Sequence, residues 1–301
     1  MDGRSWSLLA ALSVMWGAAF FFTAVQLQSL PPLTIVMLRV GLAALLLLGW
    51  AAAVRVELPR PNAWPIFLGL GLLNNVLPFA LLAVAQKSIS SGLAGILNAT
   101  TPLWGVLVAH FLTTDERATP AKIIGTIFGA AGVAAMAGYD AMAGLGNDLL
   151  AQLACLIAAL CYALAAIWSR RFVGKSLTPL AVATAQFCGA AVVMIPIALW
   201  VDRPWMLPTP GSKVWAAMLA AVIVSTVLAY IVYFKLIARI GASKALLVTF
   251  TVPIVAIFLG VTLLGEALLP KHLIGMLLIG LGLAAIDGRL WRIVVQRRSH
   301  L

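Results

Sequence analysis

The sequence has little charge. Only 10% of its 301 residues are Asp, Glu, Lys or Arg, and just nine of them are acidic. A soluble domain carries about 25% charged residues. Hydrophobic residues instead make up 63% of the chain, and the mean hydropathy is +1.08. This composition excludes an ordinary water-soluble domain and predicts a polytopic membrane protein.

Cysteine and histidine are also scarce. The three cysteines, Cys155, Cys161 and Cys188, all fall inside apolar runs, and no two of them have C-x-x-C spacing. His110 and His272 have no second metal-ligating side chain four residues away. We therefore expect buried free thiols, no disulfide, no metal site and no cofactor.

Carboxylates are missing from the centres of all the apolar runs, and this limits the chemistry of the protein. A membrane-embedded enzyme, such as a lipid-modifying transferase, would need clustered catalytic side chains near an interface. Proton-coupled carriers often hold a carboxylate within the membrane. The chain is therefore not expected to be an enzyme, and coupling to protons is either absent or uses other groups. The nine acids are Asp2, Glu57, Asp115, Glu116, Asp140, Asp148, Asp202, Glu266 and Asp287.

Long apolar runs dominate the chain. A transmembrane helix needs about 20 apolar residues, and ten windows reach that length. Together they predict an all-α polytopic membrane protein with ten transmembrane helices. The windows are Ser7–Leu27, Leu33–Val54, Trp64–Val84, Gly92–Phe111, Ala121–Tyr139, Leu149–Ser169, Pro179–Val201, Trp215–Ile237, Ser243–Leu264 and His272–Trp291.

The basic residues between these windows predict the orientation. With the N-terminus in the cytoplasm, fifteen Lys and Arg residues lie on cytoplasmic segments and four on the opposite side. This bias follows the positive-inside rule and places both termini in the cytoplasm of a cell with the protein in its inner membrane. The formal net charge of +11 then reports topology rather than nucleic-acid binding. The first apolar run continues to about Gln28, so we interpret it as a retained helix rather than a signal peptide.

The chain repeats itself weakly after 151 residues. Trp64 aligns with Trp215, and Pro102 aligns with Pro253. The repeat divides the chain into residues 1–145, with five helices, and residues 146–301, with five helices and a basic cytoplasmic tail. Because five is odd, the second half enters the membrane from the other side, which makes the repeats inverted.

One polar stretch interrupts each half at the same place. Gly92–Glu116 and Gly241–Glu266 both carry a proline in the middle of an apolar run. Such stretches are tolerated where they pack on protein or line a wet cavity, and they indicate a transport site. We expect Pro102 and Pro253 to act as hinges. Glu116 and Glu266 either cap loops and form ion pairs or help to hold a gate closed.

A GxxxG sequence spans Gly125 and Gly129 in the fifth window. Small residues at this spacing let helices approach closely. The expected neighbour is the last helix, which carries Gly275, Gly280 and Gly282.

Neutral polar and aromatic side chains gather at mid-depth. Hydrogen bonds between helices would explain many of the polar groups, but several should line a cavity that suits a zwitterion or a neutral polar solute. A phosphate ester would need two or more basic residues there. Only Arg39 lies well inside a window, and it could snorkel, pair within the protein or bind a substrate carboxylate. The candidate substrate-binding residues are Trp16, Asn74, Asn75, Phe79, Asn98, Thr101, Pro102, Trp104, Tyr162, Trp168, Gln186, Tyr230, Thr249 and Pro253.

The order of these landmarks resembles the EamA family of the drug/metabolite transporter superfamily. The features that carry the likeness are Trp16-Gly17-Ala18, Pro32 with Arg39, Pro102, Glu116-Arg117, Cys161-Tyr162-Ala163, Ser225 to Tyr230, Gly241-Ala242, Pro253 and Gly265-Glu266. Within the family the chain looks most like bacterial exporters of aromatic amino acids.

The resemblance implies two inverted repeats of five helices around a central cavity, and export of small metabolites. We predict a carrier that exports aromatic and other neutral amino acids by alternating access. The alternatives are an exporter of drugs or of other neutral metabolites, such as nucleosides or sugars, and, more remotely, the lipid-modifying enzyme. The expected partners are a small-molecule substrate and the lipid bilayer, with no nucleic acid; the oligomeric state stays open.

Overall fold

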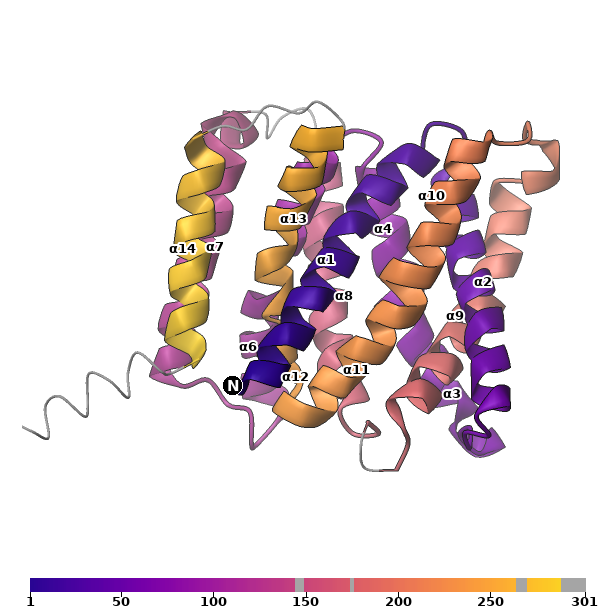
Figure 1. Cartoon of the computed structure of the whole chain (residues 1–301), viewed down its shortest axis with the longest axis horizontal. Helices are drawn as coiled ribbons and strands as arrows, with labels where there is room; N and C mark the ends of the chain where they lie inside the picture. Colours follow the sequence, from indigo (N-terminus) through magenta and orange to yellow (C-terminus); the bar gives the residue numbers. More distant parts are fainter. Residues whose placement is uncertain (144–148, 174–175, 264–269, 288–301) are drawn as a thin grey trace, which may run out of the picture.

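The computed structural model describes residues 1–143, 149–173, 176–263 and 270–287. In this part of the chain nearly all regular structure is helical, with one isolated bridge between Val173 and Leu177. The predicted all-α fold is confirmed. The helices stand side by side in one bundle, with α7 and α14 at one edge and α2 and α9 near the other (Figure 1).

The elements follow one another without intervening domains. Their bounds are α1 Gly3–Gln26, α2 Pro32–Ala53, η1 Pro61–Ala63, α3 Trp64–Gly71, η2 Leu72–Val76, α4 Leu77–Ala85, α5 Ser91–Asn98, α6 Thr101–Leu112, α7 Pro120–Ala143, α8 Leu149–Ser169, α9 Pro179–Val201, η4 Pro204–Met206, α10 Ser212–Val222, η5 Ile223–Leu228, α11 Ala229–Ile240, α12 Ala242–Ala245, α13 Val248–Leu263 and α14 Pro270–Asp287.

Eight helical segments of the described chain are long and apolar enough to cross a membrane. They include four composite spans, Pro61–Ala85, Ser91–Leu112, Ser212–Ile240 and Ala242–Leu263, each built from consecutive short elements. The remaining two expected spans correspond to α7 and α14, which fall outside this set, so the count of ten remains a prediction. The boundary between residues 145 and 146, Glu266 and the basic tail lie outside the described residues.

Side-chain caps fix where several helices begin. Asp2 accepts a hydrogen bond from the Ser5 backbone N–H at the start of α1, and Ser90 accepts one from Leu93 at the start of α5. Caps matter here because the first turn of a helix has backbone donors without intrahelical partners. We call the end of the bundle at which α1 begins the N-terminal face, and the other end the opposite face.

Two composite spans contain a π-helical segment at mid-length. These segments, η2 and η5, begin at Leu72 and Ile223, which are 151 positions apart. A π-helical turn widens the helix and often marks a functional site. Asn74 and Asn75 lie in the first segment, and Ser225 and Thr226 lie at the corresponding places in the second.

The other two interrupted spans break differently from each other. Helix α5 ends at Asn98 and α6 begins at Thr101, so Pro102 lies in the first turn of α6. The Thr101 hydroxyl donates to the Asn98 carbonyl oxygen at 2.5 Å, which Pro102 cannot do because proline has no N–H. Pro253 instead lies inside α13, and the break between α12 and α13 comes earlier.

Glycines allow two helix pairs to touch backbone to backbone. A methyl group added at Gly189 of α9 would stand 2.6 Å from the Phe67 carbonyl oxygen and 2.8 Å from the Leu68 Cα on α3. One added at Gly71 would stand 2.5 Å from the Gln186 carbonyl oxygen. Lipid chains are as apolar as leucine, so helices in a membrane associate through such close packing.

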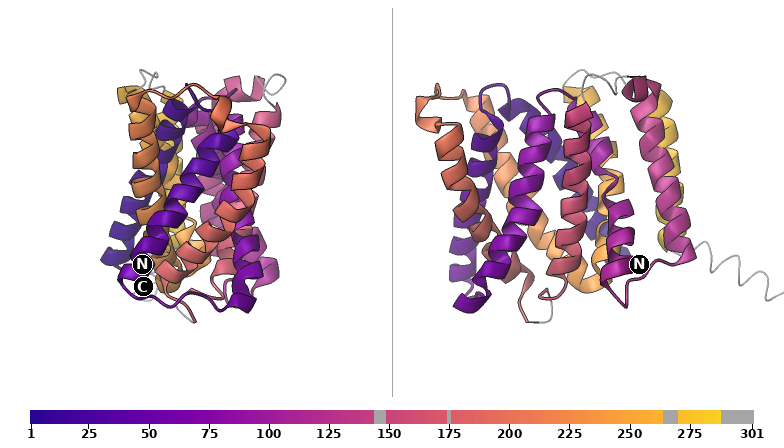
Figure 2. Two further views of the ribbon diagram at one scale, coloured as in Figure 1. Left: turned by 90° about the vertical axis from the view of Figure 1, so that its right-hand side faces the viewer. Right: turned by 180° about the vertical axis from the view of Figure 1, so that it is seen from behind.

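The expected GxxxG contact is found within this chain. A Cβ at Gly282 of α14 would lie 2.6 Å from the Gly125 carbonyl oxygen and 2.9 Å from the Gly129 backbone nitrogen of α7. The two helices run side by side in all three views (Figures 1 and 2). The prediction is confirmed for Gly282, whereas Gly280 has no atom within 4 Å of an added Cβ.

The first prediction concerns the contact between α3 and α9. Gly189→Ala should lower the thermal midpoint of the purified protein in detergent, because overpacking against rigid backbone costs about 1–3 kcal/mol. Gly49→Ala is the matched control, since Gly49 is also helical and has nothing within 4 Å; alanine there should leave the midpoint unchanged or raise it. Equal midpoints for the two variants would contradict this account of the contact.

Candidate functional site

An aromatic cluster centred on Tyr230 fills the middle of the bundle. Tyr230 is 1% exposed, and its ring lies 4.9 Å from that of Phe187, 5.8 Å from Trp16 and 6.5 Å from Phe79 between ring centroids. Its hydroxyl donates to the Asn74 carbonyl oxygen at 3.1 Å. The cluster therefore joins α1, α4, α9 and α11 around one buried side chain, in edge-to-face contacts that aromatic rings favour.

A cavity opens beside this cluster. It leaves roughly 680 Å³ free of protein atoms, a volume that includes space open to solvent. It reaches Gln86, the residue that follows the end of α4 at the opposite face. Its lining is formed by Trp16, Ala19, Phe20, Thr23, Arg39, Asn74, Phe79, Leu82, Ala83, Gln86, Asn98, Tyr162, Tyr230, Tyr233, Leu246, Thr249 and Val252.

Arg39 is the only Lys or Arg among these lining residues. It is 8% exposed and does not snorkel to the end of the bundle; its guanidinium carbon lies 4.1 Å from the centroid of the Phe79 ring. Its Nε donates to the Thr226 hydroxyl at 2.8 Å, and one terminal nitrogen donates to the Ser225 carbonyl oxygen at 3.3 Å. A desolvated cation–π contact contributes about 2 kcal/mol. These partners are all neutral, so they hold the guanidinium in place without cancelling its charge.

Amides of the first π-helical segment and of α5 supply most of the remaining polarity. The Asn74 side chain donates to the Gln186 side-chain oxygen of α9 at 3.1 Å. Asn98 lines the cavity, is 6% exposed, and its Oδ1 has no hydrogen-bond partner. A buried acceptor left without a donor costs about 1–3 kcal/mol, so a donor on a bound solute would recover that cost.

The structure brings together half of the residues that the sequence singled out. Trp16, Asn74, Phe79, Asn98, Tyr162, Tyr230 and Thr249 line the cavity. The other candidates lie outside its lining: Asn75, Thr101, Pro102, Trp104, Trp168, Gln186 and Pro253.

Sequence reasoning did not select several lining residues. Tyr233 is the clearest of them, because it follows Tyr230 by three positions and therefore lies on the same face of α11. Phe20 and Thr23 of α1 have the same relation to Trp16, at spacings of four and seven residues. Residues three, four or seven positions from Trp16 and Tyr230 share a helix face with them, so the sequence alone could have predicted that Phe20, Thr23 and Tyr233 also line the cavity.

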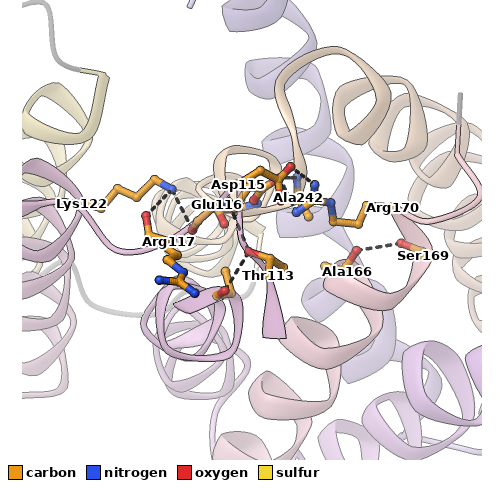
Figure 3. A network of polar contacts seen from close by, with 11 residues as sticks. Thr113, Asp115, Glu116, Arg117, Lys122, Ala166, Ser169, Arg170 and Ala242 are labelled. Atoms are coloured by element: carbon orange, nitrogen blue, oxygen red, sulfur yellow. Dashed lines mark hydrogen bonds and ion pairs between the residues drawn. The ribbon is translucent and has the colours of Figure 1, made fainter. Parts of the chain in front are cut away.

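The N-terminal face is held together by Glu116. Its carboxylate accepts hydrogen bonds from the backbone N–H groups of Ala242 at 3.1 Å and Ser243 at 2.8 Å, at the start of α12 (Figure 3). Gly241 has φ +83°, and a Cβ there would lie 2.5 Å from Glu116 Oε1, so the turn needs glycine. The contact joins two segments 126 residues apart.

Basic side chains reinforce the same face. Arg170 forms an ion pair with Asp115, and its second terminal nitrogen lies 3.4 Å from Glu116 Oε1 (Figure 3). The hydrogen bond to Asp115 raises the pKa of Arg170, which keeps it charged. Asp2 forms an ion pair with Arg239 of α11. The hydrogen bond from Arg239, and to a lesser extent the one from Ser5, holds the pKa of Asp2 well below its usual value. These contacts tie segments together at the N-terminal face, whereas the cavity reaches Gln86 on the side of the opposite face.

The described residues contain no group of three or more His, Cys, Asp or Glu side chains that could hold a metal ion. Cys155 and Cys161 are buried, Cys188 is half-buried, and all three are free thiols. The cavity therefore offers aromatic surface, neutral amides and hydroxyls, and one cation.

Comparison with known proteins gives the family. The model of the EamA-like transporter family matches residues 4–138 and again residues 149–286. The chain belongs to the EamA-like transporter family. The protein is thus a multi-pass membrane transporter of that type.

Individual relatives agree with this assignment. The EamA-like chain is 28% identical over 279 residues to the uncharacterized transporter YvbV of Bacillus subtilis, covering 92% of this chain and 89% of that protein. It is 25% identical over 263 residues to the uncharacterized inner membrane transporter YedA of Escherichia coli K12, covering 86% and 83% respectively. A solved crystal structure superimposes with a TM-score of 0.75 at 20% identity, covering 95% of this chain and 98% of the other, which shows the shared fold.

The second prediction tests which face the cavity opens to. In a variant without the three native cysteines, Asn98→Cys should react with a small charged thiol reagent added at the opposite face, because residue 98 lines the cavity. A cysteine at position 243 (Ser243→Cys), whose backbone N–H donates to Glu116, should not react with the same reagent added at the N-terminal face. A protease-cleavable tag at the N-terminus reports the orientation of the protein in the vesicles, because external protease removes it only where the N-terminal face points outward. Modification of position 98 only from the N-terminal face would contradict this reading.

Proposed function

We propose that this EamA-like transporter is a carrier that exports amino acids with aromatic and other neutral side chains. The observation that carries the proposal is the lining of the central cavity. Trp16, Phe79, Tyr162 and Tyr230 provide flat apolar surface, and Asn98 and its neutral neighbours provide hydrogen-bonding groups. Such a lining suits a solute with a small polar head and a flat apolar body.

We propose further that transport proceeds by alternating access between two inverted repeats. Two observations support the repeats: the family model matches the chain twice, and the π-helical segments lie 151 residues apart. The conformation described here is closed at the N-terminal face by Glu116 and has its cavity directed to the opposite face. It corresponds to the state in which an exporter releases its substrate.

The proposed orientation places the N-terminal face in the cytoplasm of the cell and the opposite face outside the inner membrane. The distribution of basic residues, fifteen against four, supports this assignment. Basic groups of the described N-terminal face include Arg55, Arg60, Arg117 and Arg170. Solute would then enter from the cytoplasm when the Glu116 contact opens.

We assign the gate to Glu116 and hinges to the interrupted spans. The Glu116 carboxylate caps α12 across the interface between the two halves, so its release frees α12 and α13 from the loop after α6. Pro102 adjoins the break between α5 and α6, and Pro253 removes one backbone bond within α13. These are places where the helices bend with little further loss of hydrogen bonds.

The third prediction tests the carrier and its aromatic wall. Purified protein in liposomes should carry phenylalanine with saturable kinetics, and Trp16→Ala should reduce that flux about tenfold or more by removing a ring of the cavity lining. Trp104→Ala is the matched control, because Trp104 is also half-buried but lies outside the lining. Threonine and a neutral sugar complete the panel.

The panel separates the candidate functions. Flux of the sugar without phenylalanine or threonine would replace the amino-acid assignment with the wider metabolite reading. Equal loss in Trp16→Ala and Trp104→Ala would remove the aromatic wall from the account.

The fourth prediction tests the gate. Glu116→Ala should increase the reactivity of a cysteine at position 243 from the N-terminal face, because two backbone donors of α12 lose their acceptor. Glu57→Ala removes an exposed acid on the same face and should change nothing. Unchanged reactivity in Glu116→Ala, in protein with a normal thermal midpoint, would rule out a gating role.

A further inference from the structure

Arg39 presents a positive charge to the cavity that no carboxylate of the described chain neutralises. Among the described residues, Arg170 and Arg239 form ion pairs with acidic side chains at the N-terminal face. Asp202, which lies at the end of α9 near the start of α2, accepts from the Thr34 backbone at 2.7 Å and from its hydroxyl at 2.9 Å. Arg39 is held instead by Thr226, Ser225 and the ring of Phe79.

The position of the charge is specific to one half of the protein. A shift of 151 residues places Arg39 on Ala190, which is fully buried in α9. The same shift places Thr226 on Asn75 and Tyr230 on Phe79. The two π-helical segments thus carry similar neutral groups, but only η5 is hydrogen-bonded to a cation from a neighbouring helix, Arg39 of α2. The cavity is therefore asymmetric in charge.

We propose that Arg39 binds the carboxylate of the transported solute, so that the carrier recognises monocarboxylates with an aromatic or apolar body. A guanidinium donates parallel hydrogen bonds to a carboxylate, and low dielectric strengthens such charge-assisted contacts. The π-helical segment η5 fixes Arg39 through Nε and one terminal nitrogen, which orients the guanidinium before solute arrives. The inference rests on the proposed carrier function and names the chemical group that it selects.

The rest of the lining limits what accompanies the carboxylate. It contains no acid, so an ammonium group on the solute would meet only neutral acceptors and aromatic faces. Asn98 Oδ1 is one such acceptor, since it is buried without a donor. A second anionic group would find no second Lys or Arg among the lining residues. Amino acids and simple organic acids therefore share the recognised group, and dicarboxylates and phosphate esters are disfavoured.

The fifth prediction uses four compounds that share one benzyl body. Phenylalanine and 3-phenylpropanoate carry a carboxylate, whereas phenylalaninamide and phenethylamine do not. Binding is measured as the rise in thermal midpoint with ligand concentration, which does not require transport. The wild-type protein should bind the two carboxylates about 10- to 100-fold more tightly than the other two. Tighter binding of phenylalanine identifies amino acids as the source, and tighter binding of 3-phenylpropanoate identifies organic acids.

Three variants separate recognition from folding. Arg39→Gln should abolish the preference for carboxylates while the binding of the two other compounds stays unchanged. Arg39→Lys retains the charge and should keep part of the preference for carboxylates. If Arg39→Gln does not fold, Arg39→Lys is compared with the wild type instead. Lys213→Gln, which removes an exposed charge at the opposite face, should behave as wild type.

The outcomes against the proposal are distinct from failure of the carrier function. A lower midpoint in Arg39→Gln without ligand, with an unchanged preference for carboxylates, would make Arg39 structural and overturn the proposal. Equal binding of all four compounds by the wild type would do the same. If the liposomes carried the sugar but no carboxylate-bearing solute, transport itself would stand, but both the amino-acid assignment and the role of Arg39 would fall. If they carried none of the panel, the proposed function itself would fall.

Discussion

The structure depends on one constraint, which is that hydrocarbon offers no hydrogen-bond partner to a polar group. Every interruption of a spanning helix must therefore be satisfied by the protein itself. At the break after α5, the Thr101 hydroxyl occupies the carbonyl oxygen that Pro102 leaves free. At η5, the Ser225 carbonyl oxygen accepts from Arg39. Both interruptions adjoin the cavity, through Asn98 at the end of α5 and Arg39 bound to η5, and this concentrates polar groups of an otherwise apolar protein in one place.

The proposed gate at Glu116 lies close to the cavity along the chain. Helix α12 is only four residues long and begins at the N-terminal face, where Glu116 accepts from its first backbone donors. The chain then passes directly through Leu246 into α13, whose Thr249 and Val252 line the cavity. Fewer than ten residues of continuous chain therefore separate Ala242, which contacts Glu116, from Thr249 in the cavity wall. At the other end, Arg39 is tied to η5, which continues into the α11 residues Tyr230 and Tyr233.

Much of this architecture could be predicted from the sequence because apolar length is a strong signal. The helical fold, the interruption next to Pro102 and the α7–α14 contact at Gly125 followed from composition and spacing, whereas the π-helical segments η2 and η5 did not. The residues that line the cavity could be predicted from the sequence only in part. Trp104 lies near the middle of the span Ser91–Leu112 and Trp168 near the end of α8, and both lie outside the cavity lining. Spacing along one helix does not reveal how that helix is rotated against its neighbours. Tyr233, in contrast, could have been found from its spacing of three residues from Tyr230 on α11. The role of Arg39 needed the fold, since its partners Thr226 and Phe79 lie on other helices.

The most direct test of the account is to find where a solute lies in the protein. A photoreactive phenylalanine analogue that keeps its carboxylate is activated in proteoliposomes, and the modified residues are located by mass spectrometry. The account predicts adducts on cavity residues such as Trp16, Phe79 and Tyr230, suppressed by excess phenylalanine. Adducts confined to side chains on the outer surface of the bundle, such as Phe111 and Leu150, which are 73% and 84% exposed, would contradict it, as would adducts that phenylalanine does not suppress.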